Sequence, residues 1–598
     1  TLRRESPDLY RQILQRLAEV LTDREQWAQA HAVYQRLGDR EATFSLIERA
    51  GSWMIKHGQI PALGAWLEAI PLEEREARPA LLSLLGVVRS ARDDFQSGLS
   101  LQSQALAMEE AQTVSELAAR IRLRRAADLL SLGRATEALK DADDVLDLAV
   151  NGLDQPTLLA EALWLKGTIL LEQGKAVLAT PWLEDSLQRF EKLQDAPLIA
   201  RAQMNLGVAL ERQNRYTEAR RYYELSLDHL LQVGNLVQAS TSLNNLAVLC
   251  TSTGDYEQAG ILLDRALGYA EQVGYTYSQS LIRSSLGDLY MDLKAIGAAR
   301  DTFTEALTIA QNSNQHSRQL YLHLALAHVA DVYGEGQRAK YHERQAKTLL
   351  GEYASNYDQG LWHLSEGRRA LFKGEAARAC SELAIAAKHS AADDTHTERD
   401  IAQLYLVAAY CKADQPEHAV QQLAETMERS HHSERSHKWL TLDVAAVEQL
   451  RSLTADPTVG TEVYRLLGEI EQWHYEIPRI RCRLRQRALI HPFAPPRIQI
   501  IALNGGEVIV DGKRHEDWSR LAARDLLYCL LDHPEGLSKA EIGFTFWPDK
   551  KPREVNSSFH KVKTYLRRIL GSDAILEEDS VYTFNRALDY VYDVETFR

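Results

Sequence analysis

The sequence of 598 residues is poor in cysteine and contains no long apolar run. Its five cysteines are scattered without a Cys-x-x-Cys pair, which indicates reduced thiols in a cytoplasmic protein and argues against a disulfide framework. No stretch of about eighteen apolar residues occurs, so we expect no membrane span. The chain shows no N-terminal targeting segment and begins with Thr1, so we interpret it as a fragment of a longer protein.

The motifs of common catalytic sites are also missing. There is no Gly-x-x-x-x-Gly-Lys-Ser/Thr phosphate loop, no His-Glu-x-x-His and no Gly-x-Ser-x-Gly. The histidine-rich stretch from His431 to His437 has a spacing that fits no helical pair of metal ligands with a third partner, so a polar loop between helices is favoured there. We therefore predict that the chain is not an enzyme and holds neither a metal ion nor a cofactor.

Basic residues are outnumbered by acidic ones. The chain has 69 Lys and Arg against 83 Asp and Glu, which gives a net charge of −14. This balance argues against a general affinity for nucleic acid, so any such contact has to come from a local basic surface.

What the sequence does contain is an internal repeat. Eight alanines recur with one interval of 41 residues and six of 40, namely Ala138, Ala179, Ala219, Ala259, Ala299, Ala339, Ala379 and Ala419. Twelve residues before each of them stands another small or slim residue, such as Gly207 or Gly287. A fixed period of roughly 20–50 residues is typical of a solenoid.

Each repeat is predicted to form a helix, a short turn and a second helix, because apolar residues recur at spacings of three and four on either side of a turn-like stretch. The small residues mark the points where the two helices cross, since a larger side chain would hold the backbones apart. A bulky residue four positions after the alanine, such as Tyr223, is predicted to lie in the core.

One unit closely resembles the tetratricopeptide repeat. It combines Leu286 and Gly287 with Tyr290, followed by Ala299 and Phe303, which is the pattern of that repeat. The tetratricopeptide period is about 34 residues, so we expect longer helices or longer connections here. The resemblance implies a superhelix of helical hairpins over residues 76–430, with about nine repeats.

Residues 1–75 are predicted to be helical but out of register with the repeat. A helical pair, a Gly-containing turn and the motif Trp66-Leu67-x-x-Ile70-Pro71 follow one another. This order is similar to the connector of the STAND signal-transducing ATPases typified by the bacterial maltose activator. The resemblance implies a helical connector here and an ATPase module on its N-terminal side in the full-length protein.

The solenoid is followed by a predicted helical extension over residues 431–491, which ends in the arginine-rich stretch 479–487. These arginines either contact phosphates or pair with the acidic solenoid, and pairing or plain solvation is favoured. Three prolines within residues 492–496 cannot continue a helix and mark a linker.

The periodicity changes again in residues 497–598. Two short strands flank a turn at 504–506, three helices follow, and a last strand pair flanks a turn at 577–580. Strands, three helices and a hairpin predict a winged helix-turn-helix domain. The expected fold class is therefore mainly α, a tetratricopeptide-like superhelix with a C-terminal α+β domain.

The third predicted helix of this domain, from Pro552 to Gly571, is amphipathic and basic. Seven Lys or Arg face one acid between residues 550 and 568, whereas residues 497–598 as a whole carry fifteen basic and seventeen acidic residues. Its buried face is predicted to consist of Val555, Phe559, Val562, Leu566 and Ile569. Its other faces offer cations for phosphates and polar groups for base edges, so the candidate DNA-binding residues are Lys551, Arg553, Asn556, Ser557, His560, Lys561, Lys563, Thr564, Arg567 and Arg568. A plain solvated helix is the alternative.

Several motifs of this region closely resemble the OmpR-type winged helix of the SARP class of bacterial transcription activators. They are Leu537-Ser538-x-x-Glu541-Ile542, Phe546-Trp547-Pro548-Asp549, Tyr565-Leu566-Arg567-Arg568-Ile569-Leu570-Gly571 and Asp593-Val594-Glu595-x-Phe597. Within the first motif, Ser538 and Glu541 predict a capping box. Two features depart from the family. Tyr565 stands where many relatives have a basic residue, and the acidic turn at 577–579 would be repelled by phosphate, so we do not expect the wing to contact DNA.

Polar residues two positions before the small markers should stack along one face of successive first helices. These are Asn205, Asn245, Ser285 and Ser365, which we predict to line a groove for a peptide or small effector. The alternative is that these residues are solvated or bond neighbouring backbone.

Together these patterns predict the sensor and output half of a bacterial transcription regulator, by resemblance an activator. The predicted partners are an effector in the solenoid groove and double-stranded promoter DNA, with RNA polymerase and an effector-driven oligomer as further candidates. A scaffold whose winged helix holds protein rather than DNA is the alternative.

Overall fold

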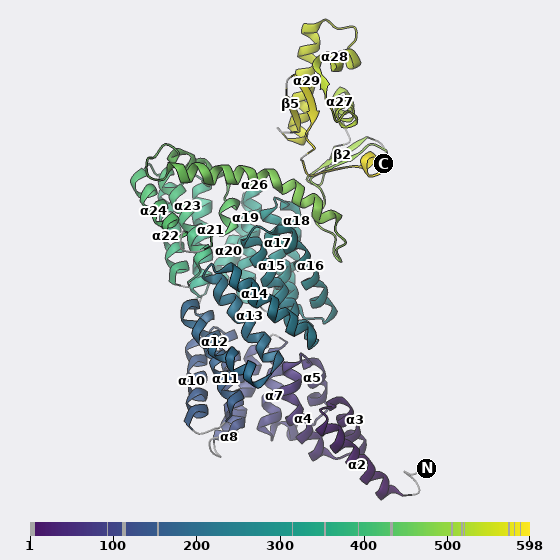
Figure 1. Cartoon of the computed structure of the whole chain (residues 1–598), viewed down its shortest axis with the longest axis vertical. Helices are drawn as coiled ribbons and strands as arrows, with labels where there is room; N and C mark the ends of the chain where they lie inside the picture. The colour runs from purple at the N-terminus through teal and green to yellow at the C-terminus, as the bar shows by residue number, and fades with distance from the viewer. Residues whose placement is uncertain are drawn as a thin grey trace.

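The computed structural model describes residues 6–597 except 93, 111–114, 152–154, 314, 352–354, 393, 431–433, 504–505, 516–517, 519–520, 572–573, 579 and 587. It is mainly helical, with small sheets near the C-terminus (Figure 1). Within these residues no helix is long and apolar enough to cross a membrane.

The centre of the molecule is a stack of helical hairpins. The first helices of the hairpins are α7 (Pro79–Ser90), α9 (Glu116–Ser131), α11 (Pro156–Glu172), α13 (Ala196–Arg212), α15 (Leu236–Ser252), α17 (Thr276–Asp292), α19 (His316–Val332), α21 (Asn356–Phe372) and α23 (His396–Lys412). The second helices are α8 (Phe95–Glu110), α10 (Ala135–Asn151), α12 (Ala176–Leu193), α14 (Tyr216–Gln232), α16 (Tyr256–Gln272), α18 (Ile296–Asn312), α20 (Gly336–Leu349), α22 (Ala376–Ala392) and α24 (Pro416–Ser430). The fold is therefore a tetratricopeptide-like superhelix, as predicted.

Helix length explains the 40-residue period. From α13 to α18 every helix has 17 residues and three residues separate each helix from the next. The middle residue of the turn has a positive φ, for example 72° at Gly234 and 87° at Gly254, which glycine adopts without a steric penalty. The longer repeat thus comes from its helices, while the connections are short.

The small residues lie where the sequence predicts close helix crossings. All eight recurring alanines are fully buried. A Cβ atom added to Gly207 would lie 2.5 Å from the Tyr223 ring, and one added to Gly287 would clash with the Phe303 ring. The bulky residue of the second helix therefore fills the space that the small residue of the first helix leaves open.

Gly287→Ala is expected to destabilise α17 and α18 by about 1–3 kcal/mol through overpacking against Phe303, although alanine favours helices. Gly468 is the matched control, because it lies inside a helix with no atom within 4 Å of an added Cβ. Gly468→Ala should stabilise its helix by about 0.5–1 kcal/mol. Amide hydrogen exchange of each helix measures both effects, and higher protection of α17 in Gly287→Ala would contradict this packing.

Successive turns of the superhelix contact each other. Lys56 binds Asp195 with an N–O distance of 2.7 Å, and the Tyr216 hydroxyl lies 2.8 Å from that of Thr397. The Thr217 amide donates to the Glu434 carboxylate at 2.9 Å. The Tyr216–Thr397 pair joins two parts of the solenoid 181 residues apart, and the other two pairs tie α4 (Arg40–Lys56) and Glu434 to the same stack. The solenoid therefore coils back upon itself around an inner groove.

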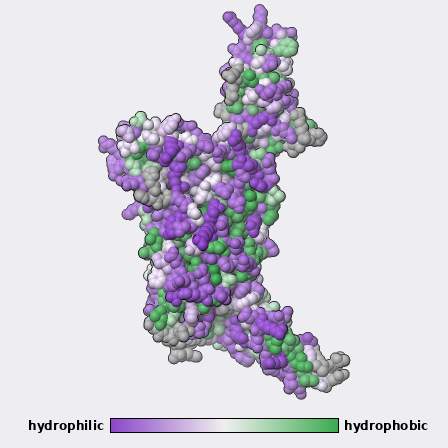
Figure 2. Space-filling model, in the orientation of Figure 1, coloured by the Kyte–Doolittle hydropathy of each residue, from purple (hydrophilic) through white to green (hydrophobic). Residues whose placement is uncertain are grey.

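The described part of the N-terminal region contains the helices α2 (Pro7–Asp23), α3 (Trp27–Leu37), α4 (Arg40–Lys56), α5 (Ile60–Glu68) and α6 (Leu72–Glu76). They form the arm at the bottom of Figure 1. Hydrophobic side chains gather on this arm in Figure 2, where Leu9, Ile13 and Leu17 of α2 are 43–48% exposed.

Helix α26 (Gly460–Gln486) lies across the top of the solenoid in Figure 1. It follows the short elements η1 (His437–Thr441), α25 (Val444–Leu450) and η2 (Arg451–Leu453). The predicted pairing of the arginine-rich stretch is confirmed for Arg483, which forms an ion pair with Glu257 of α16. Arg481 and Arg485 pair instead with Asp589 of the C-terminal domain, which the sequence did not predict.

The proline-rich linker is anchored rather than free. Its residues 492–496 have no helix or strand, and just before them the backbone amides of Ile490 and His491 donate to the Asp264 carboxylate at 2.8 and 2.7 Å. The Phe493 ring packs edge-on against Tyr290 with 5.1 Å between centroids. The linker therefore connects α26 and the C-terminal domain along the surface of α16 and α17.

The described part of the C-terminal region contains two small sheets, three helices of 8–19 residues and a short terminal helix. The sheets have the strand orders β3-β2-β1-β7 and β4-β6-β5. The strands are β1 (Ile498–Ile501), β2 (Glu507–Val510), β3 (Lys513–His515), β4 (Leu537–Ser538), β5 (Ile575–Glu578), β6 (Val581–Phe584) and β7 (Tyr590–Tyr592). The helices are α27 (Leu521–Asp532), α28 (Lys539–Phe546) and α29 (Pro552–Leu570), with the short α30 (Asp593–Phe597) at the end.

The predicted order of strands, three helices and a hairpin is present, with differences in detail. Strands β3, β4 and β7 were not predicted because each has only two or three residues. β4 and β7 pair with strands distant in sequence, and β3 is the edge strand of its sheet. Glu577 and Glu578 lie within β5 rather than in the turn, since their backbones continue the ladder with β6. Asn504, Gly505 and Asp579 of the predicted turns lie outside the described residues.

Candidate functional site

Helix α29 is the most strongly basic element of the C-terminal region. Pro552 occupies its first turn, and the Lys551 amide donates to the Glu554 carboxylate at 3.3 Å, which closes the N-terminus. Gly571 ends the helix with φ 119°. The predicted capping box of the preceding α28 is also present, between Ser538 and Glu541.

The apolar face of α29 is close to the predicted one. Phe559, Val562 and Leu566 are buried, as the spacing predicts. Val555 and Ile569 are only half-buried, and Leu570 is fully buried instead. Alternating spacings of three and four average about 3.5 residues, whereas the helix has about 3.6 residues per turn. The apolar face therefore shifts gradually around α29 along its length.

Most of the predicted DNA-binding residues share the solvent face of α29. Eight of the ten are exposed: Lys551, Arg553, Asn556, Ser557, His560, Lys561, Thr564 and Arg568. The Thr564 hydroxyl donates to the His560 carbonyl at 2.8 Å, so its hydrogen is already used within the helix. The Asn556 side chain accepts a hydrogen bond from Lys539 of α28 at 3.1 Å.

The other two, Lys563 and Arg567, are half-buried and hold the β5–β6 hairpin. Lys563 Nζ donates to Glu577 Oε2 at 3.0 Å and lies 5.0 Å from the Tyr582 ring centroid. Arg567 donates to the Ile575 carbonyl at 2.7 Å. Hydrogen bonds from Tyr582 and Lys563 lower the pKa of Glu577, so one acid of the hairpin is compensated internally.

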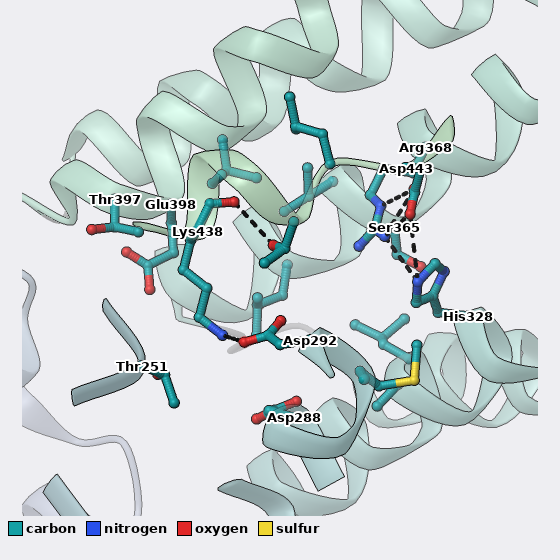
Figure 3. A pocket seen from close by; sticks show the side chains of 18 of the residues that line it. Thr251, Asp288, Asp292, His328, Ser365, Arg368, Thr397, Glu398, Lys438 and Asp443 are labelled. Atoms are coloured by element: carbon teal, nitrogen blue, oxygen red, sulfur yellow. Dashed lines mark hydrogen bonds and ion pairs between the residues drawn. The ribbon is translucent and has the colours of Figure 1, made fainter. Parts of the chain in front are cut away.

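A second site lies inside the superhelix. A cavity of about 900 Å³ is lined by the first helices α13 to α23 and by residues 438–445, which follow the solenoid in the chain (Figure 3). Leu324, Leu361 and Leu364 supply part of its apolar wall. Cavities of this size are typical of sites for small organic ligands.

Two ion pairs join the segment 438–445 to the cavity wall. Lys438 binds Asp292 of α17, and Asp443 accepts hydrogen bonds from Nε and Nη2 of Arg368 of α21 at 2.9–3.1 Å (Figure 3). Burial opposes the ionised form of Asp443, but Arg368 holds the pKa of that carboxyl well below its usual range. Burial and the adjacent Arg368 lower the pKa of His328 to about 4, so this imidazole is neutral at pH 7.

The four residues predicted to line an effector groove are divided by the structure. Ser285 and Ser365 lie in the cavity wall. Asn205 is buried and donates to the Thr168 hydroxyl at 2.7 Å, and Asn245 is half-buried outside the residues that line the cavity. Helical spacing predicts that the four residues share one face of the stacked first helices, but only Ser285 and Ser365 line the cavity.

The sequence did not indicate the charged groups of this cavity. Lys438 and Asp443 lie in the extension that follows the repeats, and no local pattern places that segment inside the superhelix. Glu211, Asp288 and Glu398 lie on repeat helices, where an acidic residue is normally solvated. Their positions relative to the small residues differ, four after Gly207, one after Gly287 and nine before Val407, so no common spacing identifies them.

The histidine-rich stretch was predicted to be a polar loop. His431 to Ser433 lie outside the described residues. His437 instead packs edge-on against Trp473, with 4.7 Å between ring centroids, and its Nδ1 lies 3.2 Å from the Tyr256 hydroxyl. Among the residues described, no three His, Cys, Asp or Glu side chains are grouped so that they could hold a metal ion.

A family model described as Tetratricopeptide repeat matches residues 158–232 and 238–312. No curated protein matches the chain. The chain is thus a tetratricopeptide-like superhelix with a small C-terminal α+β domain.

Solved structures similar to this chain include a Rap protein, a STAND ATPase and a quorum sensor. A Rap protein in complex with the competence and sporulation factor is 14% identical, with 57% of this chain and 98% of that chain covered and a TM-score of 0.44. A STAND ATPase with a tetratricopeptide repeat sensor from Pyrococcus horikoshii is 15% identical. The match covers 57% of this chain and 53% of that chain, with a TM-score of 0.42. The apo quorum sensor NprR from B. thuringiensis is 16% identical. The match covers 56% of this chain and 97% of that chain, with a TM-score of 0.39.

Proposed function

We propose that the chain is the sensor and DNA-binding output portion of a bacterial STAND-type transcription activator. The solenoid binds an effector in its cavity, and the C-terminal domain acts as a winged helix that reads promoter DNA. The chain itself performs no catalysis, and an ATPase module of the full-length protein would drive assembly on DNA.

The exposed face of α29 carries this proposal. Four cationic side chains and polar groups that suit base edges share one solvent-facing surface on a domain that is otherwise slightly acidic: Lys551, Arg553, Lys561 and Arg568 with Asn556, Ser557 and His560. Such a helix supplies phosphate contacts for position and polar contacts for sequence. The acidic hairpin, held by Lys563, makes no contact with DNA in this proposal.

Selection from a pool of random duplex DNA tests the proposal. The chain should enrich a defined sequence, and its affinity for that sequence should fall steeply between about 50 and 200 mM salt. Absence of enrichment, together with stable capture of a protein by residues 497–598, would favour the scaffold function instead.

A further inference from the structure

Three carboxylates of the superhelix cavity form no ion pair among the described residues, although the charges of Lys438 and Arg212 act on them from a distance. Glu211 of α13, Asp288 of α17 and Glu398 of α23 all line the cavity. The Tyr223 hydroxyl donates to Glu211 at 2.7 Å, and the Tyr321 hydroxyl donates to Asp288. Within the part of the chain that the structure describes, none of the three forms an ion pair within 4 Å.

Glu398 has the least support. No other described residue donates a hydrogen bond to its side chain, and Figure 3 shows the carboxylate directed toward the cavity. Burial raises the pKa of Glu398, as it raises the pKa of Glu211 to about 7 and that of Asp288 to about 6. A buried carboxylate is costly unless a cation compensates it.

Four cations of the cavity have a partner, and a fifth, Lys294, acts on His328, whose pKa its charge helps to lower. Lys438 pairs with Asp292, Arg368 with Asp443 and Arg369 with Asp331. The guanidinium of Arg212 donates to the Leu171 carbonyl. The wall around the three carboxylates is aromatic, with Tyr216, Tyr321 and Tyr357, whose ring faces attract cations.

We propose that this part of the cavity binds a small organic cation with two or more ammonium or guanidinium groups, held by Glu398, Glu211 and Asp288. The carboxylates come from three different helices and are not grouped to hold a metal ion, so an extended cation matches them better than a point charge. The apolar wall at Leu324 and Leu361 would cover its methylene groups. This inference rests on the sensing half of the proposed function.

Titration calorimetry of the full chain with spermidine and with agmatine tests the inference in the absence of DNA. At least one of the two should bind with one site per chain and raise the melting temperature, and glutarate should do neither. Glu398→Gln should weaken binding roughly thirtyfold or more, because it removes one partner of a buried charge pair. Glu428→Gln, on the exposed face of α24, is the matched control and should bind as the parent chain does.

Glu398→Gln should fold, since a buried amide costs less than an unpaired buried carboxylate. Failure of both cations to bind, or equal affinity in Glu398→Gln and the parent chain, would overturn the inference. Either result would leave the selection of duplex DNA unaffected, so failure of the cation site and failure of the DNA-binding function can be told apart.

Discussion

Replacing Arg553, Lys561 and Arg568 together with alanine is expected to lower the affinity for the selected duplex roughly a hundredfold at about 0.15 M salt. The three side chains lie on the exposed face of α29. Each neutralised phosphate contributes a slope of about −0.9 to the dependence of log K on log salt concentration, so the triple variant should lose about three units of slope. Fluorescence anisotropy across a salt series measures both quantities.

The matched control removes three exposed lysines from the solenoid, Lys340, Lys347 and Lys388. It changes the net charge by the same amount but should leave the slope unchanged. Lys563 and Arg567 are left in place, because their replacement would release the hairpin and confuse a folding effect with a binding effect. Equal slopes for the α29 variant and the parent chain would remove this helix from the proposed interface.

Asp589→Ala is expected to release the C-terminal domain from α26. Asp589 is 4% exposed and pairs with Arg481 at 2.7 Å and with Arg485, so its loss leaves the buried Arg481 and the half-buried Arg485 without their ion-pair partner. Breaking such a buried pair costs about 3–5 kcal/mol. Small-angle scattering should show a more extended molecule, and protease should cleave the linker 492–496 faster than in the parent chain.

Asp525→Ala is the control for this experiment, since Asp525 lies on α27 of the same domain and forms only an exposed ion pair with Arg524. Asp589 also accepts a hydrogen bond from the Arg497 amide at 2.9 Å, so a local effect on β1 is expected. Amide exchange of α27 and α29 distinguishes the two effects: retained protection means release of a folded domain. An unchanged scattering curve would show that the arginines do not hold the domain in place.

Much of the fold follows from local patterns. The small residue at Gly287 and the bulky one at Phe303 lie in adjacent helices of one hairpin, so their meeting depends only on residues within one repeat. The capping box at Ser538 and the ends of α29 are equally local. Short strands such as β7 escaped prediction because a three-residue strand is stabilised by its neighbour in the sheet rather than by its own sequence.

The candidate DNA-binding surface was predicted better than the cavity. One amphipathic helix defines its own exposed face, so eight of ten residues were placed by helical spacing alone. The sequence did not distinguish Lys563 and Arg567 from the other eight residues, because their hydrogen bonds to β5 depend on where that strand lies in the folded domain. For the cavity, the spacing identified Ser285 and Ser365 but none of its carboxylates.

The sequence by itself determined the repeat, the helical hairpins, the linker and the basic helix, because each depends on contacts between residues close in the chain. Only the tertiary structure decided which distant parts of the stack touch, as at Tyr216 and Thr397 within the solenoid or at Lys56 and Asp195 between α4 and the solenoid. The rotation between neighbouring repeats is small and accumulates over several of them, so residues 139 or 181 positions apart meet only when the whole stack is packed. That packing forms the cavity and leaves Glu398 in its wall without an ion pair among the described residues.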